Sequence, residues 1–397
     1  MLTLIDLVRW REIELEQLES PVPQNAGSLV WSRDSRQFAG IRFVAGARPS
    51  DLWVVDVTTR ASRSLVEVEL GDFDRWTQPE LSSDGTQLFA LGFQSDWCCG
   101  IDVEGAPYLA VFDLAGSGAV SDEVARIPLD GVLIGQQFEP VFEDGGEYNF
   151  LRNPAFVPSA DRNLVYIVHA DADRITVVDL AAATAEVEEI IRPSSALSRF
   201  GGWLASRLVS RVEAKGGVYQ RKEAQLSADG GQLYVTGVSD IVCEEIESFA
   251  CLEGHPLGLQ VVDLATMRLA AEFPGINRIA ATPDGTRVVG IGSEHDYRHV
   301  ENDRAREIGF GATVVDVTSL EMIAHIAPDV AFSDIAVSAD GRWAYLLSAG
   351  PGVDPMTLTC SERCTRLTVI DLADGTTAAT RLFESRRLQL VPLAAAP

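Results

Sequence analysis

A short apolar segment that ends in aspartate recurs seven times along this 397-residue chain. The copies are LTLIDL, LWVVDV, LAVFDL, ITVVDL, LQVVDL, ATVVDV and LTVIDL, with their aspartates at Asp6, Asp56, Asp113, Asp179, Asp263, Asp316 and Asp371. Their β-branched composition predicts buried strands, and the aspartate predicts a turn in which its carboxylate accepts hydrogen bonds from the following backbone N–H groups. Such a repeat constrains the fold strongly, because repeated units bury their apolar faces only by stacking on one another.

A second motif, Ser/Thr-x-Asp-Gly or a variant of it, precedes six of the seven segments. Its aspartates are Asp34, Asp84, Asp161, Asp229, Asp284 and Asp340. Asp-Gly between two apolar runs predicts a tight β-hairpin, because glycine adopts a positive φ without steric cost. Each repeat is therefore predicted to form four antiparallel strands, A to D, with the hairpin between A and B and the first aspartate motif at the end of C. Radial repetition of such sheets predicts an all-β fold, a seven-bladed β-propeller with four-stranded antiparallel blades.

The numbers of the two motifs differ, and the difference predicts how the ring closes. We expect residues 1–397 to form a single propeller domain, in which residues 21–382 make six full blades. Residues 1–20 are predicted to supply the outer strands of the closing blade, and residues 383–397 its inner strand. Pairing the two chain ends in one blade removes open sheet edges. The closing blade has three or four strands on this interpretation.

The order of these motifs resembles that of a known repeat family. S-x-D-G, followed by the strand LYVTG at 233–237 and then by V-x-V-x-D-L, is similar to the YVTN-type, 40-residue-repeat β-propeller family. The resemblance covers nearly the whole chain and implies a propeller. Members of that family and its neighbours include bacterial surface-layer proteins, propeller subunits of periplasmic amine dehydrogenases and lactonase-like enzymes, so the resemblance leaves the function open.

The charge and hydropathy of the chain exclude several classes of partner. The sequence has 58 Asp and Glu against 32 Lys and Arg, a net charge of −26, which disfavours nucleic acid and anionic membrane surfaces. No uncharged apolar run reaches the length of about 18 residues that a transmembrane helix needs, so direct membrane insertion is not expected. Residues 1–16 lack the apolar stretch of a signal peptide, which indicates either a cytosolic protein or a chain whose leader has been removed.

Excess length and cysteines fall in the same parts of the repeats. Long spacings place insertions in the B–C loops of blades 2, 4, 5 and 6 and in the D–A connections before blades 3 and 4, all on one face of an up-and-down blade, where binding sites concentrate. Three sequence-local cysteine pairs in these loops predict disulfides and an extracytoplasmic location: Cys98 with Cys99, Cys243 with Cys251, and Cys360 with Cys364. Free thiols are the alternative, and their spacings do not match a zinc site.

Two groups of polar residues are candidates for ligand contacts. The starts of the A strands line the axis of a propeller, and the predicted ligand-binding residues there are Gln78, Asn153, Lys222, Glu223, Asn277, Arg278, Ser333 and Asp334. Alternatively, these groups hydrate the channel or bond one another. On the looped face the candidates are Trp97, His295, Tyr297 and His299, where the two histidines suit a metal or acid–base role only if the spacing of four is helical; a solvated polar loop is favoured. His169, Asp171 and Asp173 offer a Ca²⁺ site as the alternative to an ordinary acidic turn.

The sequence carries no G-x-S-x-G, H-E-x-x-H or phosphate-loop signature. The leading hypothesis is therefore a non-catalytic, extracytoplasmic propeller scaffold without a cofactor, which binds a protein or other ligand through its looped face within a surface or periplasmic assembly. The alternative is a periplasmic enzyme or redox-complex subunit, quinoprotein-like, amine-dehydrogenase-like or lactonase-like, whose site binds a small molecule in the axial funnel.

Overall fold

The computed structural model describes the strands and turns on which the repeats are built. The described residues are 3–6, 11–14, 30–31, 37–42, 51–56, 62–64, 74–76, 79–82, 84–95, 103–114, 123–140, 147–161, 163–192, 216–244, 255–301, 304–349, 365–383 and 390. They contain strands and turns and no helix, so within these ranges no helix is long and apolar enough to cross a membrane. The all-β prediction is confirmed for this part of the chain.

Six successive sheets follow the predicted A-to-D order, and we number them as blades 1 to 6. Blades 1, 3 and 6 each contain four antiparallel strands: β3 (Val30–Trp31), β4 (Gln37–Arg42), β5 (Asp51–Asp56) and β6 (Ser62–Ser64); β14 (Ala155–Pro158), β15 (Leu164–Val168), β16 (Arg174–Asp179) and β17 (Thr184–Glu189); and β27 (Asp334–Val337), β28 (Trp343–Ala349), β29 (Thr365–Asp371) and β30 (Thr376–Phe383). Blade 5 has the same order, with β23 (Arg278–Ala281), β24 (Arg287–Glu301), β25 (Arg304–Asp316) and β26 (Glu321–Ile326).

Blades 2 and 4 carry additional strands. In blade 2, β7 (Asp74–Trp76) and β8 (Glu80–Leu81) both pair with β9 (Gln87–Ser95), which is followed by β10 (Val103–Asp113) and β11 (Glu123–Pro128). The sheet of blade 4 contains seven strands: β12 (Gly135–Pro140), β13 (Glu147–Asn153), β18 (Gly216–Leu226), β19 (Gln232–Glu244), β20 (His255–Pro256), β21 (Leu259–Asp263) and β22 (Arg268–Phe273). A separate hairpin of β1 (Thr3–Asp6) and β2 (Arg11–Glu14) begins the chain.

Neighbouring blades pack face to face, and their inner strands touch in chain order. Contacts join β3 to β8, β8 to β14, β14 to β18, β18 to β23 and β23 to β27. A separate buried apolar cluster fills each gap from blade 1 to blade 6; between blades 2 and 3, for example, Phe89 and Leu109 meet Phe156 and Ile167. Burial of each large apolar side chain contributes about 1.5–3 kcal/mol, so these interfaces are the main stabilising contacts of the fold.

The repeated hairpin aspartates form one network that recurs in five blades. In blade 4, Ser227 Oγ donates to Asp229 Oδ1 (2.6 Å), Gly231 N–H donates to the same oxygen (3.0 Å), and Gln232 N–H donates to Ser227 Oγ (2.9 Å). Equivalent bonds surround the hairpin aspartates of blades 2, 3, 5 and 6, namely Asp84, Asp161, Asp284 and Asp340. The hydroxyl is therefore as much a part of the motif as the Asp-Gly pair.

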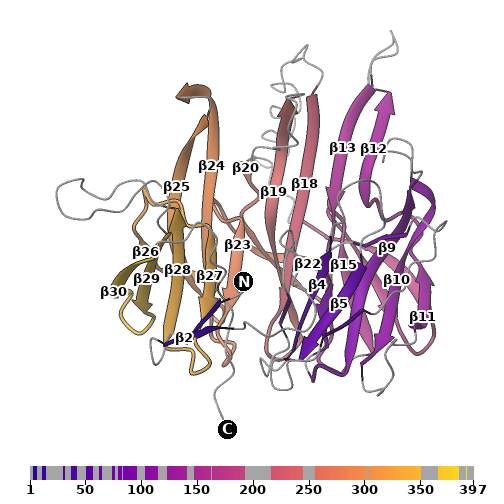
Figure 1. Cartoon of the computed structure of the whole chain (residues 1–397), viewed down its shortest axis with the longest axis horizontal. Helices are drawn as coiled ribbons and strands as arrows, with labels where there is room; N and C mark the ends of the chain where they lie inside the picture. Colours follow the sequence, from indigo (N-terminus) through magenta and orange to yellow (C-terminus); the bar gives the residue numbers. More distant parts are fainter. Residues whose placement is uncertain are drawn as a thin grey trace.

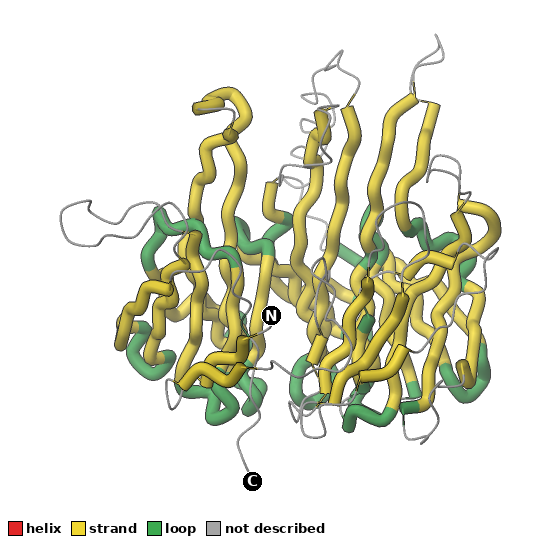
Figure 2. Tube along the Cα trace, in the orientation of Figure 1, coloured by secondary structure: helices red, strands yellow, loops and turns green. Residues whose placement is uncertain are grey.

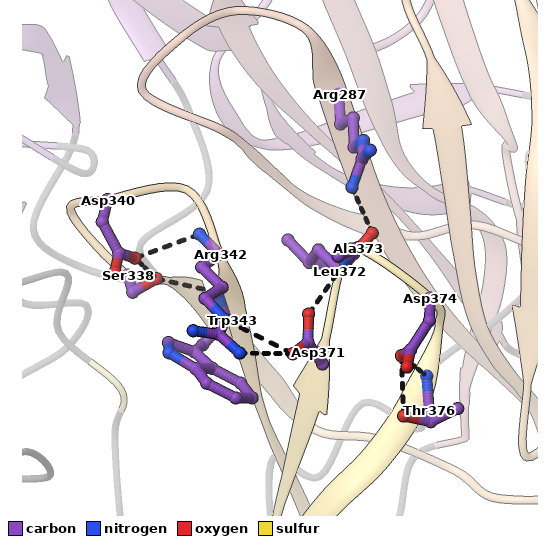
Figure 3. Close-up of polar contacts among 10 residues, drawn as sticks. All are labelled: Arg287, Ser338, Asp340, Arg342, Trp343, Asp371, Leu372, Ala373, Asp374 and Thr376. Carbon is purple, nitrogen blue, oxygen red and sulfur yellow. Dashed lines mark hydrogen bonds and ion pairs between the residues drawn. The ribbon is translucent and has the colours of Figure 1, made fainter.

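The strand C aspartates close the following turns as the sequence predicts. Asp371 Oδ1 accepts a hydrogen bond from Ala373 N–H (2.9 Å), while its other oxygen is 3.1 Å from the Arg342 guanidinium, which lies over the Trp343 ring (Figure 3). Asp179, Asp263 and Asp316 bond backbone N–H groups two or three residues further on in the same way. Both aspartate motifs thus fix turns at the same end of the strands.

We expect Asp229→Ala to lower the free energy of unfolding by about 1 kcal/mol, because two hydrogen bonds to the carboxylate are lost from an exposed turn. These bonds hold the pKa of Asp229 below its ordinary value, so the stabilisation is present above the unfolded-state pKa and is lost as the pH falls below about 4. Urea denaturation at pH 7 and pH 3.5 measures both effects. Asp329→Ala, at an exposed aspartate, is the control, and an equal loss in the two variants would contradict the prediction.

At the opposite end of the strands, three strand pairs extend beyond the blades. Figure 1 shows β12 with β13, β18 with β19, and β24 with β25 all reaching past the other strands on one side. β13 pairs in parallel with β18, and β20 pairs with β19 and contacts β24. We call this wall, residues 135–140, 147–153, 216–221, 238–244, 255–256, 293–301 and 304–309, the crown.

The crown corrects the prediction that these insertions are loops. Paired strands satisfy the backbone N–H and C=O groups of a long insertion, which a free loop of the same length leaves to water. Figure 2 shows the contrast between these long strands and the short turns at the other end of the blades. The prediction that excess length in blades 4 and 5 lies on one side is confirmed for the described residues.

Candidate functional site

Five ionisable side chains meet where the inner strands begin, and we call them the inner ion cluster: Glu80, Arg221, Glu223, Arg278 and Asp334. Glu223 Oε1 lies 3.3 Å from Arg221 Nη2 and 3.7 Å from Arg278 Nε. Arg278 Nη1 donates to the backbone oxygen of Ser333 (2.8 Å) and lies 3.5 Å from Asp334 Oδ1. The cluster therefore links the inner strands of blades 4, 5 and 6.

Asp334 also binds the C-terminal segment. Its Oδ2 accepts a hydrogen bond from Leu390 N–H (2.7 Å), and Oδ1 accepts one from Ile335 N–H (2.9 Å). Burial raises the pKa of Asp334, although these two N–H groups and Arg278 oppose the rise. The Leu390 side chain packs against the apolar residues of blade 6. Asp334 thus connects the start of β27 to the C-terminal segment through hydrogen bonds.

Glu80, on β8, enters the cluster as a neutral acid. Burial raises its pKa from 4.5 to about 8, and the negative charge of Glu223 adds to the rise. At neutral pH the carboxyl therefore keeps its proton. The remaining charges of the cluster are two carboxylates and two guanidinium groups, which compensate one another.

The Lys222 side chain lies on the opposite face of β18 from Glu223. Alternate residues of a strand point to opposite faces, so Lys222 faces blade 3 while Glu223 faces blade 5. Its Nζ donates to the backbone oxygen of Ala172 (3.1 Å), and the side chain is 7% exposed. Lys222 therefore belongs to a different cluster from Glu223, although the sequence predicts both for one funnel.

The aspartates in the turn of blade 3 form ion pairs with arginines. Asp173 is 2.5 Å from Arg192 Nε, and Asp171 is 3.5 Å from Arg174. Within the described residues no group of three or more His, Cys, Asp or Glu side chains could hold a metal ion. The geometry at this turn is that of ion pairs and does not favour the Ca²⁺ alternative.

The remaining predicted residues have other positions. Asn277 is buried and its Nδ2 donates to the backbone oxygen of Ser293 (3.2 Å), so it supports the base of the crown; Asn153 ends β13. Gln78, Trp97, Cys98, Cys99, Cys251, Cys360 and Cys364 lie outside the described residues.

Two placements on the looped face are wrong. His295, Tyr297 and His299 lie in strand β24, so neither a loop nor a helix describes their backbone. Cys243 lies in β19 opposite Gly217, whereas the sequence places it in a loop. In both cases the chain extends a blade strand into the crown, and the apolar core pattern that marks a strand in sequence stops at the base of that extension.

Two members of the inner ion cluster are absent from the predicted site. Glu80 lies two residues after the predicted Gln78, and Arg221 lies one residue before the predicted Lys222. The strand alternation that separates Lys222 from Glu223 also places Arg221 beside Glu223. A count by alternate residues along each A strand could have found Arg221. The raised pKa of Glu80 comes first from burial and then from the charge of Glu223 in another blade, and neither can be read from the sequence around Glu80.

The described residues define an all-β protein of successive four-stranded antiparallel sheets with adjacent inner strands. Solved structures similar to it include hydrazine synthase from Kuenenia stuttgartiensis (14% identity, 89% of this chain and 79% of that chain, TM-score 0.43). Others are the β-propeller domain of Cps50 (Swd1) from Myceliophteria thermophila (12% identity, 91% and 88%, TM-score 0.44) and TolB from Acinetobacter baumannii (12% identity, 89% and 66%, TM-score 0.40). No family model and no curated protein matches the sequence.

Proposed function

We propose that the chain is a seven-bladed, YVTN-type β-propeller that works outside the cytoplasm as a binding scaffold, with a protein partner held against the crown. The observation that carries this proposal is the asymmetry of the two ends of the blades. One end consists of short turns fixed by aspartates, and the other carries the crown, which is built from the sheets of blades 4 and 5. Rigid elements that project from a scaffold on one side supply surface for recognition.

The proposed scaffold is closed by the chain ends and braced by cysteines. Residues 1–20 and 383–397 form the seventh blade, and the bond from Leu390 to Asp334 supports this position for the C-terminal strand. Disulfides from Cys98 to Cys99, Cys243 to Cys251 and Cys360 to Cys364 are part of the proposal, as is the periplasmic or surface location that they require.

The inner ion cluster supports a structural role for the axis. Each carboxylate of the cluster has a cationic or N–H partner, and each links one inner strand to the next. The second candidate function, an enzyme with its site at the axis, is favoured by one observation. Burial raises the pKa of Glu80 to about 8 beside the Glu223 side chain, and a carboxyl with a raised pKa is suited to general acid–base catalysis.

A shortened crown tests the scaffold hypothesis. Replacement of residues 294–308 by Asn-Gly keeps β24 and β25 paired in blade 5 and removes their extension. We expect the native host's partner to be recovered by cross-linking with the full chain and reduced at least about tenfold with the shortened chain, because the contact surface is lost. The matched control inserts Gly-Ser after Gly285, in the hairpin at the other end of the same blade.

Three results would count against the proposal. Equal recovery of the partner by all three proteins would remove the crown from the interface. Six free thiols in the protein from its native host would place it in a reducing compartment. If Glu80→Gln abolished a measured turnover without unfolding the protein, the axial enzyme would become the better hypothesis.

A further inference from the structure

A second polar cluster lies between the base of the crown and the turn of blade 3. Gln220 and Lys222 share one face of β18, and that face meets the turn between β15 and β16, as the bond from Lys222 to Ala172 shows. The parallel pairing with β13 places Arg152, which is 5% exposed, opposite Gln220. His169, which is fully buried, lies at the start of the same turn.

Four buried polar atoms in this region have no hydrogen-bond partner: His169 Nδ1, Asp171 Oδ1, Arg174 Nε and Gln220 Oε1. At least about 90% of buried polar groups in folded proteins are hydrogen-bonded, so unpartnered atoms that gather in one place need a common explanation. His169 Nε2 already contacts Thr176 Oγ1 (2.8 Å), so of the two ring nitrogens only Nδ1 is without a partner.

The charges of the region define the chemistry of that molecule. Asp171 pairs with Arg174, and Arg192 pairs with both Asp173 and Glu272. Lys222 has no carboxylate within 4 Å among the described residues, and burial lowers its pKa more than the more distant Asp173 raises it. An anion in direct contact with Lys222 stabilises the ammonium form.

We propose that a small hydroxycarboxylate binds where β18 meets the turn His169–Arg174. Its carboxylate oxygens accept hydrogen bonds from Lys222 Nζ, from Arg174 Nε and from His169 Nδ1–H, the tautomer in which the Thr176 hydroxyl donates to Nε2. Its hydroxyl donates to Asp171 Oδ1 or Gln220 Oε1, the two unpartnered acceptors. The site lies at the base of the crown and shares no residue with the inner ion cluster.

Titration calorimetry with sodium glycolate tests the site, with sodium acetate as the probe that lacks the hydroxyl and sodium chloride as the ionic-strength control. We expect glycolate to bind more tightly than acetate, and chloride to give no saturable heat. Lys222→Met should weaken glycolate binding by about 10- to 100-fold, the effect of one charge-assisted hydrogen bond. Lys215→Met is the matched control, because Lys215 and Lys222 are the only two lysines of the chain.

A measurement on the unmodified protein covers the case in which Lys222→Met does not fold. The ¹⁵N resonance of His169 Nδ1, assigned by its absence from His169→Gln, should shift on addition of glycolate and not of chloride. The same heats and the same ¹⁵N spectrum in all three salts would mean that water alone bonds the unpartnered polar atoms and would overturn the proposal. Equal affinity of Lys222→Met and Lys215→Met for glycolate would also overturn it.

Discussion

Glu80→Gln will stabilise the protein at pH 8 and leave its stability almost unchanged at pH 4.5. The Glu80 carboxyl has a pKa of about 8 in the folded protein, against 4.5 as its ordinary value, because it is buried beside the negative charge of Glu223. Between these pH values the folded chain binds a proton that the unfolded chain has released. The free energy of unfolding therefore falls as the pH rises from about 4.5 to about 8. A glutamine carries no charge and has no such dependence.

The expected gain at pH 8 has an upper bound of about 4–5 kcal/mol, the free-energy equivalent of the pKa difference. Urea denaturation at several pH values between 4.5 and 9 measures it, and the difference between variant and wild type cancels the titration of the other groups. Glu188→Gln, at an exposed position on β17, is the control and should give a flat difference. A flat difference for Glu80→Gln as well would show that the Glu80 carboxyl is ionised at neutral pH.

The blades could be predicted from the sequence because their signals are local. The Asp-Gly hairpin and the strand C aspartate each act within a few residues, as the bonds of Asp229 and Asp371 show. Apolar alternation then places the strands between them. Repetition adds redundancy, so the variants around Asp34 and Asp161, which lack the glycine, do not obscure the pattern.

The candidate sites could be predicted only in part, because their geometry depends on neighbours from other blades. Glu223, Arg278, Ser333 and Asp334 meet as residues at equivalent positions of successive inner strands, which the repeat alignment can find. Lys222 is adjacent to Glu223 in sequence but bonds Ala172, fifty residues away. The crown was not predicted, because β13 and β18 pair in parallel across a long separation in sequence that carries no local signal.

Asp334→Ala will release the C-terminal segment from blade 6. The substitution removes the acceptor of Leu390 N–H and leaves Arg278 without its contact to Oδ1, while Ser333 O and Glu223 still bind the guanidinium. Loss of a largely buried carboxylate that has both an N–H and a cationic partner costs about 2–4 kcal/mol of stability. We expect this loss in urea denaturation, together with faster amide exchange at Leu390.

Ser333→Ala separates this effect from a general disturbance at the start of β27. Ser333 contributes its backbone oxygen to Arg278, and alanine keeps that oxygen, so both stability and exchange at Leu390 should stay close to those of the wild type. If the last strand closes the proposed ring, its release frees the inner edge of blade 6, and exchange should also rise along β27. Protection of Leu390 that survives Asp334→Ala would mean that apolar packing on blade 6 alone holds the segment. Rapid exchange confined to Leu390, with β27 still protected, would show that the hydrogen bond between Leu390 and Asp334 does not hold the ring closed. That result would refute the proposed link between the two.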